Sequence, residues 1–243
     1  MTSNLISEIR SKYDQISQQI ENACAKSKIQ SPPVRIVVVT KTHPIDSVRA
    51  VLEAGIRDLG ENYVEEATEK IDVIGHVDLL SWHMIGHIQS RKANLVVNNF
   101  SVVHSVDSLK LAIRLNRFAL ENNKRINILL ECNMSGEESK FGFPAFEKTL
   151  WPAFISESSQ IAELANLNIC GLMTMPPLFE IPEKNRPYFE KLRNLRDVLS
   201  EKLPSTNWTE LSMGTSTDYI VAVEEGATLV RIGTAILGSR SYK

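Results

Sequence analysis

Short apolar segments alternate with longer segments of helical periodicity along nearly the whole chain, and this alternation limits the possible folds most strongly. Eight apolar segments have the length of strands: residues 34–39, 57–60, 82–85, 101–104, 126–131, 168–173, 208–211 and 228–232. The first and fifth are apolar at consecutive positions, as expected of parallel strands covered on both faces. Eight strand–helix units predict a single closed (β/α)₈ TIM barrel of the α/β class. An open, doubly wound sheet is the alternative, although no GxGxxG motif follows the first strand.

The segment before the first predicted strand has the pattern of an amphipathic helix. Its apolar side chains recur every three or four residues, at Leu5, Ile9, Tyr13, Ile16, Ile20 and Ala23. Pro32 and Pro33 end this pattern, because proline cannot continue a helix. We expect one domain over residues 1–243, with an N-terminal helix in 1–30, the barrel over 34–232 and a C-terminal segment over 233–243.

Charge and cysteine content exclude several classes of protein. The 27 basic and 29 acidic residues are spread along the chain, so we expect no nucleic-acid partner. Cys24, Cys132 and Cys170 lie far apart, which argues against disulfides and a structural zinc site and predicts small buried side chains. No segment approaches the roughly 20 apolar residues that a membrane span needs. We expect a cytoplasmic monomer without a metal or a membrane contact.

Glycines and small polar residues gather directly after the predicted strands. These segments read TKTHP, GENY, GHIQS, CNMSGEESK, TMPP, SMGTS and GT. Functional groups of a TIM barrel lie at the carboxyl ends of its strands, so a polar small-molecule site is expected there. Lys41 follows the buried strand IVVVT and should point into the barrel mouth, where burial would lower its pKa and make the amine reactive toward an aldehyde. A lysine that extends to solvent is the alternative.

The segments after strands seven and eight both place glycines beside hydroxyl groups. TIM barrels often bind phosphate at this position, through backbone N–H groups and the start of a short helix. The candidate donors are Ser212, Gly214, Ser216, Gly233 and Thr234. Ordinary strand-to-helix turns with serine or threonine caps would also give this pattern.

Arg231 lies inside the apolar strand TLVRI, where a guanidinium group needs an acceptor. Alternation along the strand places it on the same face as Leu229. It could donate to a pyridine nitrogen, or it could form a structural ion pair with a buried carboxylate such as Glu61 or Glu131.

Three further polar residues follow predicted strands or lie within them. His83 and His87 have a spacing seen in metal sites, but Gly86 intervenes and no HExxH glutamate is present, so both are expected to line the site or support it. Asn62 could bond to a substituent of a cofactor ring, or it could cap the next helix.

Taken in order, eight segments resemble the pyridoxal phosphate homeostasis protein family. They are VVVTKTHP, RDLGENYVEEATEK, WHMIGHIQSRK, SVDS, NMSGEESKFGF, GLMTMPP, LSMGTSTDY and VRIGTAILGSR. The resemblance implies a barrel like the N-terminal domain of alanine racemase, with pyridoxal 5′-phosphate (PLP) bound in its mouth as a Schiff base on Lys41. It also implies phosphate contacts from Ser212, Ser216, Gly233 and Thr234, and Arg231 near the pyridine nitrogen. Asn62 lies in the matching GENY segment.

The sequence departs from the family pattern at two positions. His43 stands where a second lysine is expected, and Thr215 stands where methionine is more common in the phosphate loop. The first departure removes a possible second acceptor of the aldehyde. Lys140 matches a family lysine that could contact PLP, whereas a solvated lysine in an acidic loop is the simpler interpretation.

Three functions remain open at this point. The resemblance implies a carrier of PLP in vitamin B6 homeostasis, without an established reaction, that passes the cofactor to apo PLP-dependent enzymes. A PLP-dependent racemase is the second possibility, with Tyr63 and Tyr219 as candidate acids. Racemases of the related fold add a second domain, for which the ten or so residues after strand eight leave no room. A barrel that binds another phosphorylated metabolite without an imine is the third.

Overall fold

The strands close into a parallel barrel. The computed structural model describes residues 2–29 and 32–239, so residues 1 and 30 of the predicted N-terminal segment and residues 240–243 of the C-terminal segment lie outside it. The barrel strands are β1 (Arg35–Val39), β2 (Asp58–Glu61), β3 (Ser81–Met84), β4 (Val102–Val106), β5 (Ile126–Asn133), β7 (Leu167–Met173), β8 (Glu210–Thr215) and β9 (Leu229–Ile232). β1 pairs with β9 in parallel, which closes the barrel and rules out the open sheet.

Two details of the sheet differ from the prediction. A two-residue strand, β6 (Phe143–Pro144), pairs with the end of β5 and was not expected. The seventh predicted strand ends at residue 211, whereas β8 continues to Thr215. Only one of the last four residues of β8 is a large apolar side chain, so the apolar pattern does not mark this part of the strand.

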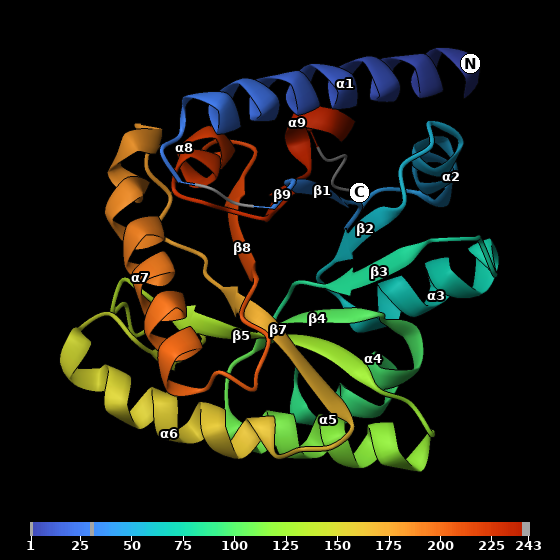
Figure 1. Ribbon diagram of the computed structural model, residues 1–243. Helices are drawn as coiled ribbons and strands as arrows, with labels where there is room; N and C mark the ends of the chain where they lie inside the picture. Colours follow the sequence, from blue (N-terminus) through green and yellow to red (C-terminus); the bar gives the residue numbers. More distant parts are fainter. Residues whose placement is uncertain (1, 30–31, 240–243) are drawn as a thin grey trace.

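Helices surround the barrel on its outside (Figure 1). They are α1 (Thr2–Lys26), α2 (Ile45–Glu53), α3 (Val64–Ile74), α4 (Ala93–Asn99), α5 (Leu109–Glu121), α6 (Trp151–Ala162), α7 (Arg186–Lys202), α8 (Tyr219–Glu224) and α9 (Thr234–Leu237), with 3₁₀ turns η1 (Ser90–Lys92), η2 (Lys148–Leu150) and η3 (Pro182–Asn185). The predicted N-terminal helix is α1, which packs on α2, α8 and α9. Its apolar face is buried through Ile9, Ile16, Ile20 and Ala23.

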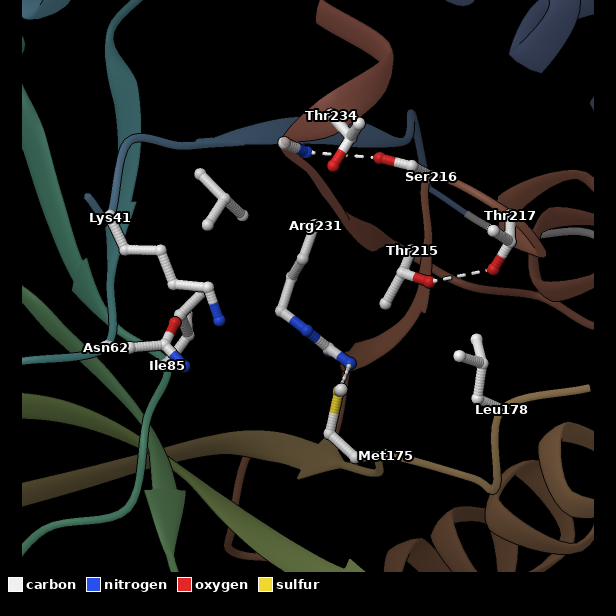
Figure 2. A pocket seen from close by; sticks show the side chains of 12 residues that line it. Lys41, Asn62, Ile85, Met175, Leu178, Thr215, Ser216, Thr217, Arg231 and Thr234 are labelled. Carbon is white, nitrogen blue, oxygen red and sulfur yellow. Dashed lines mark hydrogen bonds between the residues drawn. The ribbon is translucent and has the colours of Figure 1, made fainter. Parts of the chain in front are cut away.

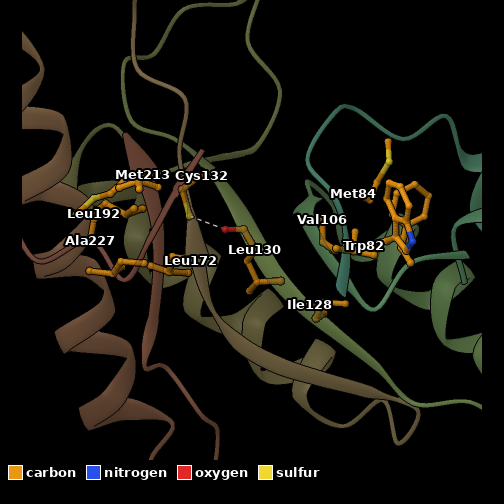
Figure 3. Packing of buried hydrophobic residues seen from close by; sticks show 14 of the residues in the cluster. Trp82, Met84, Val106, Ile128, Leu130, Cys132, Leu172, Leu192, Met213 and Ala227 are labelled. Atoms are coloured by element: carbon orange, nitrogen blue, oxygen red, sulfur yellow. Dashed lines mark hydrogen bonds between the residues drawn. The ribbon is translucent and has the colours of Figure 1, made fainter. Parts of the chain in front are cut away.

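Most of the apolar core lies between the strands and the outer helices. Figure 3 shows part of this layer, where Leu172 and Met213 from the strands pack near Leu192 of α7. Cys132 is buried in the same layer, Cys24 and Cys170 are partly buried, and all three are free thiols. No helix in residues 2–29 or 32–239 is long and apolar enough to cross a membrane.

The inside of the barrel is only partly apolar. Val37, Leu129, Met173 and Leu229 form a separate buried cluster there. Side chains alternate along a strand, so the residues two positions from Val37 and Leu229 face the same interior. In this way β1 leads from Val37 to Val39 and Lys41, and β9 leads from Leu229 to Arg231. The strands therefore bring a lysine and an arginine to one end of the barrel.

Candidate functional site

A cavity of about 340 Å³ opens at the carboxyl ends of the strands. It is lined by Val39, Lys41, Asn62, Ile85, Met175, Leu178, Thr215, Ser216, Thr217, Arg231, Gly233 and Thr234. Figure 2 shows the Lys41, Asn62 and Arg231 side chains reaching into one space, with Ser216 and Thr234 across from Lys41. Six of the predicted site residues thus meet in one pocket, whose volume suits a small molecule.

The backbone that carries Lys41 is held by a buried polar cluster. Thr42 has a left-handed backbone with φ of 62°, and its N–H donates to Glu66 Oε1 at 2.6 Å. On the other side of Lys41, the Thr40 hydroxyl donates to Glu61 Oε1 at 2.6 Å. Both residues next to Lys41 are therefore fixed by carboxylates, which sets the direction in which the lysine leaves the strand.

Lys70 joins these two carboxylates. Its Nζ donates to Glu61 Oε1 at 2.8 Å, to Glu66 Oε1 at 2.6 Å and to the Thr40 carbonyl at 2.7 Å. Burial raises the pKa of Glu61, and the Lys70 charge and hydrogen bond act against that rise. The sequence analysis did not identify Lys70. Its only signal was the four-residue spacing from Glu66 on α3, which is typical of ordinary helical ion pairs.

Opposite Lys41, the loop after β8 meets the start of α9. Ser216 Oγ accepts from the Gly233 N–H at 3.2 Å and from the Ala235 N–H at 3.3 Å. Asp218 holds the same loop, because its Oδ1 accepts from Thr215 N at 2.6 Å and from Thr215 Oγ1 at 3.0 Å. This wall of the pocket presents hydroxyl and backbone N–H groups, the donors that proteins use for phosphate.

Ser212 and Gly214 do not line the pocket, contrary to their prediction as phosphate donors. Ser212 is fully buried inside the barrel, where its hydroxyl contacts His104 and Arg231. Gly214 has φ of +91°, and a Cβ there would lie 2.6 Å from the Ala222 Cβ, so this glycine allows α8 to pack on β8. The two residues belong to β8, which continues past residue 211.

Arg231 forms the floor of the pocket and makes no ion pair with Glu61 or Glu131 in the part of the chain that the structure describes. Its guanidinium donates to Ser212 Oγ at 2.6 Å, to the Thr174 carbonyl at 2.9 Å and to Met175 Sδ at 2.8 Å. Burial lowers its pKa to about 10, although the charges of Asp218 and Glu131 oppose this shift. A guanidinium of that pKa remains protonated at neutral pH.

Asn62 carries an unsatisfied polar atom into the pocket. Its buried Oδ1 has no hydrogen-bond partner among the described residues. Gly86 packs directly on the Asn62 backbone, because a Cβ at Gly86 would lie 2.4 Å from the Asn62 carbonyl oxygen. A buried amide oxygen without a partner costs free energy, and a bound ligand could supply the missing bond.

A second group of residues lies at the same end of the barrel, outside the pocket lining. His87 pairs with Asp107 at 3.1 Å and stacks on Phe141. Burial, followed by the Asp107 charge, raises the pKa of Glu131 to about 7, while the charges of Arg231 and Lys140 oppose the rise. Lys140 Nζ donates to the Met175 carbonyl at 2.9 Å. Lys140 thus contacts Met175, which lines the pocket, but does not line the pocket itself.

The histidine pair of the sequence analysis is divided between two environments. His83 is fully buried inside the barrel, whereas His87 lies at the mouth and is partly exposed. Within residues 2–29 and 32–239 no cluster of three or more histidine, cysteine or acidic side chains could hold a metal ion.

The pocket residues fit a small ligand that carries an aldehyde and a phosphate. Lys41 offers an amine, Ser216 and the loop before α9 offer anion donors, and Arg231 offers a charged donor between them. Asn62 offers, on the remaining side, an acceptor oxygen that has no partner among the described residues. These four groups surround one space, so a single ligand could contact all of them.

The chain is similar to known proteins along nearly its whole length. Residues 12–241 match the family model of the alanine racemase N-terminal domain. A protein of Synechocystis sp. named pyridoxal phosphate homeostasis protein is 42% identical over 209 residues, which are 86% of this chain and 93% of that protein. The structure of PipY from Synechococcus elongatus with PLP bound has a TM-score of 0.78 at 33% identity and covers 92% of this chain and 100% of that chain. An alanine racemase of Clostridium difficile has a TM-score of 0.70 at 16% identity, with 98% of this chain and 58% of the racemase covered, and shows a common fold alone.

Proposed function

This chain belongs to the pyridoxal phosphate homeostasis protein family, and we propose that it binds PLP in the pocket at Lys41 and serves as a carrier and buffer of this cofactor. The observation that carries the proposal is the convergence of Lys41, Ser216 and Arg231 on one cavity. Bound PLP supplies a reactive aldehyde that condenses with amines. A protein that holds PLP reversibly would limit the concentration of that free aldehyde.

Each polar group of the pocket has a role in this proposal. Lys41 holds the cofactor covalently through its amine, and the Glu61–Lys70–Glu66 cluster fixes the backbone on both sides of it. Ser216, Gly233 and Thr234 bind the phosphate. Arg231 donates to the pyridine nitrogen, and since its pKa stays far above neutral it keeps that nitrogen unprotonated. A neutral pyridine is a weak electron sink, which suits storage better than carbanion chemistry.

The position of the candidate acids favours a carrier over a racemase. The Tyr219 hydroxyl donates to Gln19 of α1, on the outer side of the barrel. Tyr63 is 55% exposed and does not belong to the residues that line the cavity. A racemase needs an acid within hydrogen-bond reach of the reacting carbon, and neither tyrosine offers one in this geometry.

We further propose that residues 1–243 work as one domain and as a cytoplasmic monomer that releases PLP to apo PLP-dependent enzymes. The packing of α1 on α2, α8 and α9 supports a single unit. A sedimentation experiment on the purified chain, with and without PLP, measures the oligomeric state directly.

The proposed function is tested by mixing the purified chain with PLP, recording the visible spectrum, reducing with borohydride and mapping the modified peptide by mass. We expect one pyridoxyl group, on Lys41. Modification of another lysine, or none on a folded chain, would contradict the proposal. In a parallel sample, incubation with L-alanine should give no more D-alanine than PLP alone; clear turnover would favour the racemase.

A further inference from the structure

A continuous line of polar side chains crosses the inside of the barrel, from the floor of the pocket to the opposite end. Arg231 Nη1 lies 2.6 Å from Ser212 Oγ, and Ser212 Oγ lies 2.8 Å from His104 Nδ1. His104 Nε2 lies 2.9 Å from His83 Nδ1, and His83 Nε2 lies 2.8 Å from Asp58 Oδ1. Five strands, β2, β3, β4, β8 and β9, contribute one residue each.

The far end of this line is also anchored. Arg35, at the start of β1, lies 3.6 Å from Asp58 and donates to Glu210 Oε1 at 3.0 Å. Burial acts to raise the pKa of Asp58, while the hydrogen bond from His83 and the charge of Arg35 act against it, and the pKa is lowered. Asp58 is therefore an ionised acceptor. The line runs from a fixed donor, Arg231, to a fixed acceptor.

These two ends determine the direction of every hydrogen bond between them. Arg231 can only donate, so Ser212 Oγ accepts from it and gives its own proton to His104 Nδ1. His104 then carries its proton on Nε2 and donates to His83 Nδ1. His83 in turn carries its proton on Nε2 and donates to Asp58. Both histidines are neutral in this arrangement, and each buried donor has one acceptor.

The reverse direction satisfies fewer groups. A doubly protonated His83 would donate to His104 Nε2, and His104 would donate from Nδ1 to Ser212 Oγ. That oxygen would then receive two donors, and its own proton would lose the acceptor that the first arrangement gives it. A cation would also lie inside the barrel near Arg231. Burial above all, with the charges of Arg231 and Arg35, holds the pKa of His104 well below its usual value, which agrees with the neutral form.

We propose that Ser212, His104 and His83 are positioning residues that hold the Arg231 guanidinium at the floor of the pocket through a one-directional hydrogen-bond chain ending on Asp58. The hydrogen bond to Ser212 at the start of this chain holds Nη1 of Arg231, so that the guanidinium group cannot turn toward the buried carboxylate of Glu131. This inference rests on the proposed function only where PLP affinity is the measurement.

The first experiment uses the unmodified chain without PLP. Long-range ¹H–¹⁵N correlation spectra of the ¹⁵N-histidine-labelled protein report the protonated nitrogen of each of the five histidines. Signals of the two buried rings are assigned as those lost in His83→Gln and in His104→Asn. We expect neutral Nε2–H forms of both His83 and His104 at pH 7. A proton on His104 Nδ1, or a doubly protonated His83, would overturn the proposal.

The second experiment interrupts the hydrogen-bond chain and measures the effect on PLP binding, which depends on the position of Arg231. Ser212→Ala removes both the acceptor of Arg231 and the donor to His104, and PLP binding should weaken about tenfold, with a shift of the visible absorption band. Ser158→Ala is the control, because Ser158 is equally buried but lies on α6. Melting temperatures of both variants show whether they are folded.

A pair of substitutions at His104 separates positioning from packing. Asn at this position keeps an oxygen near Nδ1 for the Ser212 hydroxyl, whereas Leu keeps only the volume. PLP binding should weaken about tenfold in His104→Leu and less than about threefold in His104→Asn. Equal losses in the two variants, or an unchanged affinity and spectrum in Ser212→Ala, would overturn the proposal. If the unmodified protein fails to bind PLP, the proposed function fails. The NMR result would still decide the direction of the hydrogen bonds from Arg231 to Asp58.

Discussion

The mouth of the barrel has two unlike halves. In the half formed by the loops after β1, β2, β8 and β9, several polar groups are fixed by hydrogen bonds, such as Thr42 to Glu66 and Ser216 to Gly233, while Asn62 Oδ1 has no partner among the described residues. In the half formed by the loops after β3, β4, β5 and β7, Phe141 and Leu178 are 53% and 84% exposed, and Glu131 Oε2 is buried without a partner among the described residues. The fixed half is organised before a ligand arrives. Substitutions of polar groups that line the pocket in the fixed half should therefore weaken PLP binding more than substitutions of polar groups in the other half.

The largest expected difference between the two halves is in covalent PLP binding, and it is tested by replacing one lysine in each half. Lys41→Ala removes the only amine that lines the described cavity, so the visible absorbance of a covalent PLP adduct should be lost completely. Lys140→Ala should keep that absorbance, because the Lys140 amine is bonded to the Met175 carbonyl outside the pocket lining. Visible spectra recorded before borohydride reduction, and peptide mapping after it, measure both. Loss of the adduct in Lys140→Ala alone would reverse the assignment of the halves.

The support of the fixed half can be broken at Lys70. Lys70→Met leaves the buried Glu61 and the neighbouring Glu66 without their cation, and loss of one partner of a buried ion pair should lower the free energy of unfolding by about 4 kcal/mol. Denaturant titration measures this change.

Lys92→Met is the matched control for Lys70→Met. Lys92, at the end of η1, pairs with Glu65 of α3 near the surface, and such pairs contribute little to stability. A similar loss in both variants would mean that the cluster behind Lys41 is no better organised than a surface pair.

In the other half, Glu131 should be a source of instability. Its pKa of about 7 lies above the ordinary 4.5, so the folded chain binds more protons than the unfolded chain between these pH values. The free energy of unfolding therefore falls as the pH rises through this window, by up to about 3 kcal/mol. Glu131→Gln cannot ionise, and its advantage over the unmodified chain should grow from near zero at pH 4.5 to this value at pH 8.

Denaturant titrations at several pH values test the Glu131 prediction. Equal stability of Glu131→Gln and the unmodified chain at pH 8 would show that the Glu131 carboxylate has a partner in solution. A lower stability of the variant at pH 8 would place Glu131 among the stabilising groups and remove the contrast with Glu61.

Sequence patterns predicted the barrel and six of the twelve residues that line the pocket, because both depend on local alternation. Eight apolar runs predicted the closed sheet. The position of Lys41 directly after the first strand, two residues beyond Val39, predicted that its side chain points into the barrel mouth. The patterns failed where contacts between distant residues decide. Ser212 was expected in a loop, but β8 continues past it with a shift of register against β9.

The residues that sequence analysis missed have partners far away in the chain. His104 bonds to Ser212, 108 residues later, and Lys70 bonds to Thr40, 30 residues earlier. A signal for His104 was present, since it ends the apolar run SVVH just as Arg231 interrupts TLVRI. A polar side chain within a barrel strand predicts an interior contact, but only the fold names the partner.

The smallest expected effect compares two serines across the mouth. Ser216→Asp places a negative charge where the Ser216 hydroxyl accepts hydrogen bonds from the Gly233 and Ala235 N–H groups. The carboxylate would repel a phosphate bound at this wall of the pocket. PLP binding should weaken about tenfold or more, as measured by titration of the visible absorbance. The adduct on Lys41 should still form at high PLP concentration, because the amine is intact.

Ser139→Asp introduces the same charge on the other half of the mouth, in the exposed loop after β5. If the phosphate lies only against the β8–β9 wall, this variant should bind PLP as the unmodified chain does. Raising the salt concentration should narrow the difference between the two variants, because it screens charge repulsion but leaves lost hydrogen bonds unchanged. Equal weakening in both variants would mean that PLP binding responds to the total charge of the mouth, and the phosphate site would then not belong to Ser216.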